Sequence, residues 1–386
     1  MAGEGSGRNA AGTVPSVSSA PAVTLRAASA LLPHGLTGPV EVEVAGGIVV
    51  DVRTGADPGD GSLLAPGFVD LQVNGVDDVD ASRSEGGDWD RIGARLAATG
   101  VTAWLPTVVT RPLDRYAGPL ARIDAARAEG GHGAVVLGAH LEGPFLGGRP
   151  GAHDRGAIVP IDEGWLAGLP PAVRLVTLAP EQAGAADAIR ALVARGVVVS
   201  IGHSDADLAT ACAALDAGAA MATHLFNAMA PLHHREPGIA GAVLADDRVV
   251  AGLIADLVHV HPALLRTAFR AKGAERIALV TDAVAWRAGH LAGAQVRIVD
   301  GAPRLADGTI AGSALTMDAA VRNVVDAAGV PVADALVAAS ATPAALLGDG
   351  TRGRIEPGRR ADLVILGGDD LAVRRTLVAG EVVAEA

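Results

Sequence analysis

Eight short apolar runs follow one another along the chain at fairly regular intervals. Each is rich in Val, Ile, Leu and Ala and lacks a clean alternation of apolar and polar positions, which is typical of parallel strands buried on both faces. The runs are Phe68–Val73, Thr102–Val109, Ala134–His140, Val173–Leu178, Val197–His203, Met221–Leu225, Val249–Ala255 and Ile277–Asp282.

Segments with helical spacing separate most of these runs. Clear examples are Asp88–Ala98, Ala183–Arg195, Asp207–Ala217 and Pro262–Lys272. Eight buried strands alternating with helices predict an α/β fold, a (β/α)8 TIM barrel. In that fold the catalytic residues lie at the carboxyl ends of the strands.

The two ends of the chain have a different pattern. Residues 39–45 alternate strictly and are joined at Gly46-Gly47 to a second strand-like stretch, 47–52. Residues 361–366 and 376–384 also read as short antiparallel strands. We therefore expect a small β-sandwich built from both chain ends. The predicted organisation is a disordered tail (1–21), the β-sandwich (22–64 and 350–386) and the barrel (65–349).

Two segments interrupt the barrel pattern. The stretch 145–163 is long and rich in glycine, and a loop of this length on the catalytic side is usually functional. The insertion 288–312 contains 295–299 and 302–305, which predict a small hairpin. A helix over 316–328 is expected to close the barrel.

Composition excludes several classes of function. The net charge of −12 argues against a nucleic-acid partner, and no apolar run is long enough to span a membrane. Cys212 is the only cysteine, so the chain can form neither an internal disulfide nor a cysteine-based zinc site. The first 21 residues lack the features of a signal peptide, and we expect a cytoplasmic protein. Lys272, the only lysine, precedes a strand, which excludes a metal centre bridged by a carbamylated lysine at a strand's carboxyl end.

Glu142, His203 and His224 are the candidate metal ligands. They lie at or just past the ends of the third, fifth and sixth predicted strands, so they can converge above the barrel. Two histidines and a glutamate form a common catalytic zinc set that leaves one position for water. Either histidine alone fits a satisfied core position better than a ligand position, but the three residues together favour a metal.

Asp282, at the end of the eighth strand, is placed to take a proton from a metal-activated water and return it to a leaving amine. Gln72 and Asn74 end the first strand, and their neutral amides suit hydrogen bonds to that water better than zinc ligation. This pattern predicts one divalent metal per subunit, with zinc favoured. Asp256 is a weaker candidate for the role of Asp282.

Other polar residues near strand ends each have more than one possible role. His140 is two residues before Glu142 and is either a ligand or a partner of one. Arg235, in the loop after the sixth strand, suits an anionic substrate group or a surface ion pair with Glu236. Ser313 lacks the flanking glycines of a serine-hydrolase elbow.

Several motifs together resemble the N-acetylglucosamine-6-phosphate deacetylases of the amidohydrolase superfamily. The resemblance extends over about residues 40–386. It rests on residues 65–70 (APGFVD), 140–145 (HLEGPF), 202–204 (GHS), 223–229 (THLFNAM), 235–238 (REPG), 256–259 (DLVH), 280–283 (VTDA), 311–317 (AGSALTM) and 357–363 (PGRRADL).

The resemblance implies a role for each matching residue. Glu142, His203 and His224 correspond to metal ligands and Asp282 to the general acid and base. His153 would contact the substrate's carbonyl or sugar ring, and a second group would line the sugar-phosphate pocket. That group is Asn227, Ala228 and His259. The resemblance also implies a homodimer, in which Arg235 reaches the phosphate in the neighbouring subunit's site. The Gln72-Val73-Asn74 sequence matches the single-metal branch of the family.

The expected reaction is hydrolysis of the acetamide of N-acetylglucosamine 6-phosphate to glucosamine 6-phosphate and acetate. Three alternatives remain open: an N-acetylgalactosamine-6-phosphate deacetylase, an N-acyl-amino-acid deacylase, and a non-catalytic scaffold on the same fold. The sequence Val284-Ala285-Trp286-Arg287 replaces small residues common in the family, so the pocket shape there is not predicted.

Overall fold

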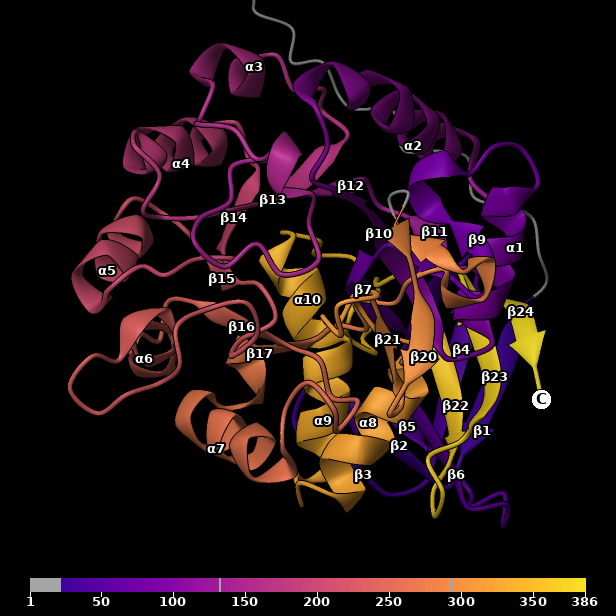
Figure 1. The fold of residues 1–386 in the computed structure, drawn as a ribbon. Coiled ribbons are helices and arrows are strands. Elements are labelled where there is room, and N and C mark those ends of the chain that lie inside the picture. Colours follow the sequence, from indigo (N-terminus) through magenta and orange to yellow (C-terminus); the bar gives the residue numbers. More distant parts are fainter. Residues whose placement is uncertain (1–21, 132, 292–293) are drawn as a thin grey trace, which may run out of the picture.

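The computed structural model describes residues 22–131, 133–291 and 294–386, and the predicted tail 1–21 lies outside them. The centre of the molecule is a parallel barrel wrapped by helices (Figure 1). Its strands follow one another in chain order: β7 (Phe68–Val73), β10 (Val101–Val109), β12 (Ala139–Glu142), β13 (Val173–Leu178), β14 (Val198–Ile201), β15 (Met221–Ala222), β16 (Val250–Leu253) and β17 (Ile277–Leu279). The predicted (β/α)8 barrel is confirmed.

The barrel closes just beyond the last strand. β17 ends at Leu279, and the chain continues beside β7, where Val73 and Ala283 form a parallel bridge. The amide of Asp282 donates a hydrogen bond of 2.9 Å to the carbonyl of Gln72. Closure therefore places Asp282 next to the end of the first barrel strand.

Helices and short 3-10 turns connect the barrel strands. Two helices show clear end signals: Asp207 caps α5 by accepting from Thr210 N at 2.8 Å, and α7 begins with Pro262 and ends before Gly273. The helices are α1 (Asp88–Ala97), α2 (Ala117–Glu129), α3 (Glu163–Ala167), α4 (Ala185–Ala194), α5 (Leu208–Asp216), α6 (Gly238–Ala245), α7 (Pro262–Lys272), α8 (Met317–Asp326), α9 (Val332–Ala339) and α10 (Ala341–Leu346). The 3-10 turns are Ala81–Arg83, Leu113–Arg115, Arg155–Ala157, Ala274–Arg276 and Trp286–Ala288. Within the described ranges no helix has the length and apolarity needed to cross a bilayer.

Strands from both chain ends form two further sheets beside the barrel (Figure 1). The three-stranded sheet has the order β1 (Val23–Ala27), β4 (Val40–Ala45), β5 (Ile48–Thr54). The six-stranded sheet has the order β24 (Glu381–Glu385), β23 (Val373–Val378), β22 (Leu363–Gly367), β6 (Ser62–Pro66), β2 (Ser29–Leu32), β3 (Gly35–Thr37). Leu25 and Val42 of the smaller sheet share one buried cluster with Leu64 and Leu377 of the larger sheet, so the two sheets form the predicted sandwich.

The third predicted strand is broken in two. β11 (Val135–Val136) and β12 both pair with β10 but are separated at Gly138, which has φ +147°. A Cβ at Gly138 would lie 2.4 Å from the carbonyl oxygen of Ala172, so only glycine fits this close approach. The apolar run itself carries no sign of the break.

Short antiparallel strand pairs follow the carboxyl ends of two barrel strands, β7 and β17. β8 (Gly75–Val76) pairs with β9 (Val79–Asp80). The insertion after β17 forms two pairs, of which the second is the predicted hairpin. These pairs are β18 (His290–Leu291) with β19 (Ala294–Gln295), and β20 (Arg297–Val299) with β21 (Ala302–Arg304).

Candidate active site

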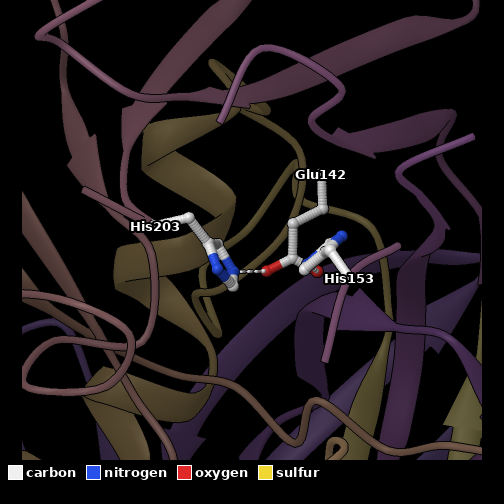
Figure 2. Close-up of side chains that lie close together, drawn as sticks. All are labelled: Glu142, His153 and His203. Atoms are coloured by element: carbon white, nitrogen blue, oxygen red, sulfur yellow. Dashed lines mark hydrogen bonds and ion pairs between the residues drawn. The ribbon is translucent and has the colours of Figure 1, made fainter. Parts of the chain in front are cut away.

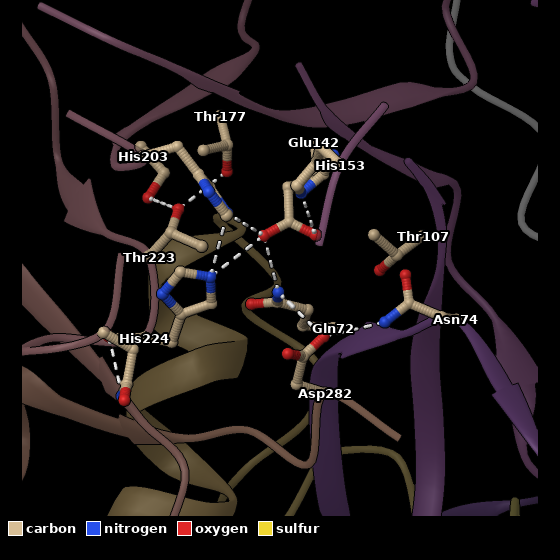
Figure 3. A network of polar contacts seen from close by, with 12 residues as sticks. Gln72, Asn74, Thr107, Glu142, His153, Thr177, His203, Thr223, His224 and Asp282 are labelled. Atoms are coloured by element: carbon tan, nitrogen blue, oxygen red, sulfur yellow. Dashed lines mark hydrogen bonds and ion pairs between the residues drawn. The ribbon is translucent and has the colours of Figure 1, made fainter. Parts of the chain in front are cut away.

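Three side chains from separate strands converge at the carboxyl end of the barrel (Figure 3). Glu142 is the last residue of β12, and His203 and His224 follow β14 and β15 by two residues. Glu142 Oε1 lies 3.0 Å from His203 Nε2 and 3.1 Å from His224 Nε2, and the two histidine nitrogens are 3.1 Å apart. All three predicted ligands are buried and present one atom each to the same point.

The backbone at this point is unusual. His203, His224 and Asp282 have positive φ values of 51°, 31° and 49°. Non-glycine residues adopt the left-handed region at a cost, and such residues cluster at functional sites. Here the positive φ turns the backbone just after the strand has ended, so that each of the three side chains points into the site.

The chemistry of this donor set fits a divalent cation. His203 Nδ1 donates to the carbonyl of Arg149 at 3.1 Å, which leaves the lone pair of Nε2 directed at Glu142. Burial raises the pKa of the Glu142 carboxyl, but protons shared with His203 and His224 hold it well below the usual range, and a cation bound there would replace those protons. Buried His224 Nδ1 has no partner among the described residues. A carboxylate with two imidazole nitrogens is a typical zinc set.

His153 approaches the same carboxylate from the loop that follows β12 (Figure 2). Its Nε2 is 3.8 Å from Glu142 Oε2, and Glu142, His153 and His203 also satisfy the geometry of a metal cluster. Nδ1 of His153 accepts from the amide of Thr110 at 3.3 Å, so Nε2 carries the ring proton. Burial, and then repulsion from His203, lowers the pKa of His153 to about 3. His153 is therefore a neutral donor facing the site.

Asp282 is held by two amides. Asn74 Nδ2 donates to its Oδ1 at 2.7 Å, and Gln72 Nε2 donates to the same oxygen at 3.1 Å and to Glu142 Oε1 at 3.0 Å. Burial, and then repulsion from Glu142, raises the pKa of Asp282 to about 7. The amide oxygens of Gln72 and Asn74 are buried without a partner among the described residues, so they remain available as acceptors.

A pocket of about 300 Å³ opens above these groups. The predicted residues Asn227, Ala228 and His259 line it, and His259 Nδ1 is 2.7 Å from Asp256 Oδ2. Asp256 is thus the partner of His259 rather than a second base at the metal. The pocket is large enough to hold a small substrate above the convergence point.

Two candidates lie apart from the convergence point. Arg235 is exposed, and among the described residues its guanidinium contacts only His234, at 2.9 Å. His140 uses both ring nitrogens within the barrel, Nδ1 with the carbonyl of Leu71 at 3.1 Å and Nε2 with Thr177 Oγ1 at 2.8 Å. Burial lowers the pKa of His140 to about 4. His140 therefore supports the strand ends and is not directed at the metal position.

The structure adds residues that the sequence pattern did not single out. Thr110 donates its amide to His153 and its hydroxyl to the carbonyl of Glu142, at 3.1 Å. Leu291, Thr309 and Ile310 of the insertion line the pocket. Trp286 does not line it but stacks under the Arg287 guanidinium, 4.7 Å from the ring centre. Thr110 directly follows β10, so its position at a strand end was a signal that could have found it. The residues of the insertion and Trp286 do not follow a barrel strand closely, so strand-end position gives no signal for them.

Residues 63–383 match the model of the Amidohydrolase family, and the chain belongs to that family. It is 45% identical to the N-acetylglucosamine-6-phosphate deacetylase of Bos taurus over 84% of both chains. It is 40% identical to the N-acetylgalactosamine-6-phosphate deacetylase of Escherichia coli O157:H7, over 89% of this chain and 94% of that protein. Among solved structures, the Mycobacterium smegmatis N-acetyl-D-glucosamine-6-phosphate deacetylase in complex with N-acetyl-D-glucosamine-6-phosphate superposes with a TM-score of 0.88. That match has 35% identity and covers 95% of this chain and 100% of the other.

Proposed function

We propose that this protein hydrolyses the acetamide of N-acetylglucosamine 6-phosphate, giving glucosamine 6-phosphate and acetate. The observation that carries the proposal is the convergence of Glu142, His203 and His224 on one point beside Asp282 at the mouth of the barrel. The similarity to deacetylases of N-acetylated sugar 6-phosphates supports the choice of substrate.

Glu142, His203 and His224 would hold the metal ion. We infer a single divalent cation per subunit, with zinc favoured by the two imidazoles and one carboxylate. When bound there, the ion supplies Lewis acidity, which lowers the pKa of water and polarises a carbonyl. The amides of Gln72 and Asn74, in place of further ligands, support a single-metal site, and their free oxygens suit hydrogen bonds to water.

Asp282 then moves the proton. Its Oδ1 is held by Gln72 and Asn74, while its Oδ2 has no partner among the described residues and is free to accept. Asp282 takes the proton of the attacking water as the new C–O bond forms, and returns it to the sugar nitrogen as the C–N bond breaks. A pKa near 7 suits a group that must do both.

His153 would stabilise the acetamide oxygen. As a neutral donor at Nε2 it can hydrogen-bond that oxygen as negative charge develops on it. Asn227, Ala228 and His259 line the part of the pocket assigned to the sugar phosphate. We also propose a homodimer, as the resemblance to the deacetylase family implies, in which the exposed Arg235 of one subunit completes the phosphate site of the other.

The galacto epimer is the second candidate substrate. It is favoured by the 40% identity to an N-acetylgalactosamine-6-phosphate deacetylase over nearly its whole length. We also propose a cytoplasmic location, since a charged sugar phosphate does not cross a bilayer unaided.

The metal requirement tests the proposed function directly. Protein stripped with a chelator should turn over no N-acetylglucosamine 6-phosphate, and one equivalent of Zn²⁺ per chain should restore full activity. A Glu142→Gln variant should bind Zn²⁺ much more weakly and stay inactive at that stoichiometry. Full turnover by metal-free protein would contradict the proposal.

A further inference from the structure

The first residues of the loop after β12 are hydrogen-bonded to the segments that follow two neighbouring strands, β13 and β14. On the β13 side, Ala179 N donates to the carbonyl of Phe145 at 2.9 Å and Gln182 Nε2 to that of Leu146 at 2.6 Å. On the β14 side, Gly147 N donates to the carbonyl of His203 at 2.9 Å. The loop therefore runs between the two strand exits.

Glu181 joins all three segments. Its Oε1 accepts from Gly148 N at 3.3 Å and from Asp205 N at 3.0 Å, and its Oε2 accepts from the hydroxyl of Ser204. Arg149 adds a contact of 2.5 Å between its Nε and Asp205 Oδ1. Although Glu181 is at the surface, its carboxylate binds the loop and the segment just after His203 at once.

Two glycines make this close approach possible. A Cβ at Gly147 would lie 1.9 Å from Glu181 Oε1, and a Cβ at Gly148 would lie 2.3 Å from Asp205 Oδ2. Neither glycine has a positive φ, so their small size rather than their backbone freedom is what the contact requires.

The fastened loop orients two residues of the site. The carbonyl of Arg149 accepts the Nδ1 proton of His203 at 3.1 Å, which directs Nε2 at Glu142. The chain then turns at Gly151, against the His203 ring, and reaches His153. A shift of the Gly147–Arg149 segment would thus change the donor geometry of His203 and the position of His153 together.

We propose that Glu181 is a positioning residue for the metal centre and acts through the backbone of this loop. The inference rests on the proposed metal site at Glu142, His203 and His224. Groups that orient metal ligands typically contribute 10–100-fold in affinity or activity. Because Glu181 acts one step further out and is exposed, we expect an effect of about tenfold.

Zn²⁺ affinity, measured by competition with a chromophoric chelator on metal-free protein, gives a readout independent of turnover. Glu181→Ala should bind Zn²⁺ about tenfold more weakly. Glu181→Gln, which keeps an acceptor for both amides and a donor for Ser204, should stay close to wild type. Asp187→Ala is the matched control, since within the described part of the chain this exposed carboxylate contacts only Arg190, and it should leave affinity unchanged.

A double-mutant cycle with Gly147→Ala tests whether Glu181 acts through the loop. As a single variant, Gly147→Ala should weaken Zn²⁺ binding. In the Glu181→Ala background it should add little, because its closest clash, with Glu181 Oε1, is gone. Wild-type affinity in folded Glu181→Ala, or additive losses in the cycle, would overturn the inference. If Glu181→Ala does not fold, the Zn²⁺ affinity of Gly147→Ala is compared with that of Glu181→Gln. Weaker binding by Gly147→Ala supports the inference, and equal binding overturns it. Absence of Zn²⁺ binding by wild-type protein would instead reject the proposed function.

Discussion

Single residues at this site derive their chemistry from their hydrogen-bond partners. Asp282 illustrates this: two amides hold its Oδ1, burial and Glu142 raise its pKa to about 7, and its Oδ2 stays free. Asp282→Asn should therefore retain the metal and lose turnover by about 10²–10⁴-fold, the usual contribution of a general acid or base. Amine release and metal content of the purified variant check this. Near-normal turnover would remove Asp282 from the mechanism.

Asp70 should make stability depend on pH. It is fully buried, accepts from Thr281 Oγ1 at 2.6 Å, and burial raises its pKa to about 7 from 3.8. The folded state therefore binds more protons than the unfolded state between about pH 4 and 7, and the free energy of unfolding falls there as pH rises. The slope from this group is about 1.4 kcal/mol per pH unit.

Asp70→Asn should remove that slope. Urea unfolding of metal-free wild type and variant at pH 5, 6 and 7 measures it as the difference between the two proteins. Parallel pH profiles for wild type and variant would show that Asp70 titrates normally in the folded state.

At the residue scale the sequence predicts positions better than orientations. Glu142, His203, His224 and Asp282 are identifiable because each lies at or near the end of an apolar run. The direction of the Asn74 amide is not predictable, since it depends on a carboxylate 208 positions away in the chain. The residues of the insertion that line the pocket do not follow a barrel strand closely, and no local pattern indicates that they fold over the site.

At the scale of elements, hydrophobic pattern predicts existence and order well. All eight barrel strands form within their predicted runs or one residue beyond them, except that the third run is broken at Gly138 and continues to Glu142. That break depends on close contact with Ala172, which is distant in sequence. Pairing between the two chain ends likewise depends on contacts that no local pattern encodes, such as that of β6 with β22.

The joint between the terminal strands and the helical layer depends on Asp362. This buried carboxylate contacts Arg352 Nε at 2.7 Å and Arg360 Nε at 2.9 Å, and accepts from Ala379 N at 2.7 Å. Asp362→Ala leaves the largely buried Arg352 without this partner, so the free energy of unfolding should fall by about 3–5 kcal/mol. Asp362→Asn, which keeps an acceptor for Ala379, should cost less. Chemical denaturation measures both, and a loss below about 1 kcal/mol in the alanine variant would contradict this role.

At the scale of the whole molecule, the proposed dimer predicts that subunits share sites. Arg235→Ala should raise the KM for the sugar phosphate about 10–100-fold, the usual value of a charged hydrogen bond, and leave the KM for the unphosphorylated sugar unchanged. An equal change for both sugars would contradict a contact with phosphate.

Mixing inactive Asp282→Asn with Arg235→Ala subunits tests the sharing itself. A mixed dimer has one site with an intact Asp282 and an intact Arg235 from its partner, so about one quarter of all sites should regain wild-type KM. Mixing without recovery would place Arg235 outside the neighbouring site.

Amine release from three sugars decides whether the protein is a deacetylase of N-acetylated sugar phosphates. Zn²⁺-reconstituted protein should be assayed with N-acetylglucosamine 6-phosphate, its galacto epimer and the unphosphorylated gluco sugar. We expect fast turnover of the gluco phosphate and far slower turnover of the unphosphorylated sugar. No turnover of any of the three by protein with one bound Zn²⁺ would contradict this expectation, and would assign the same centre to another amide substrate.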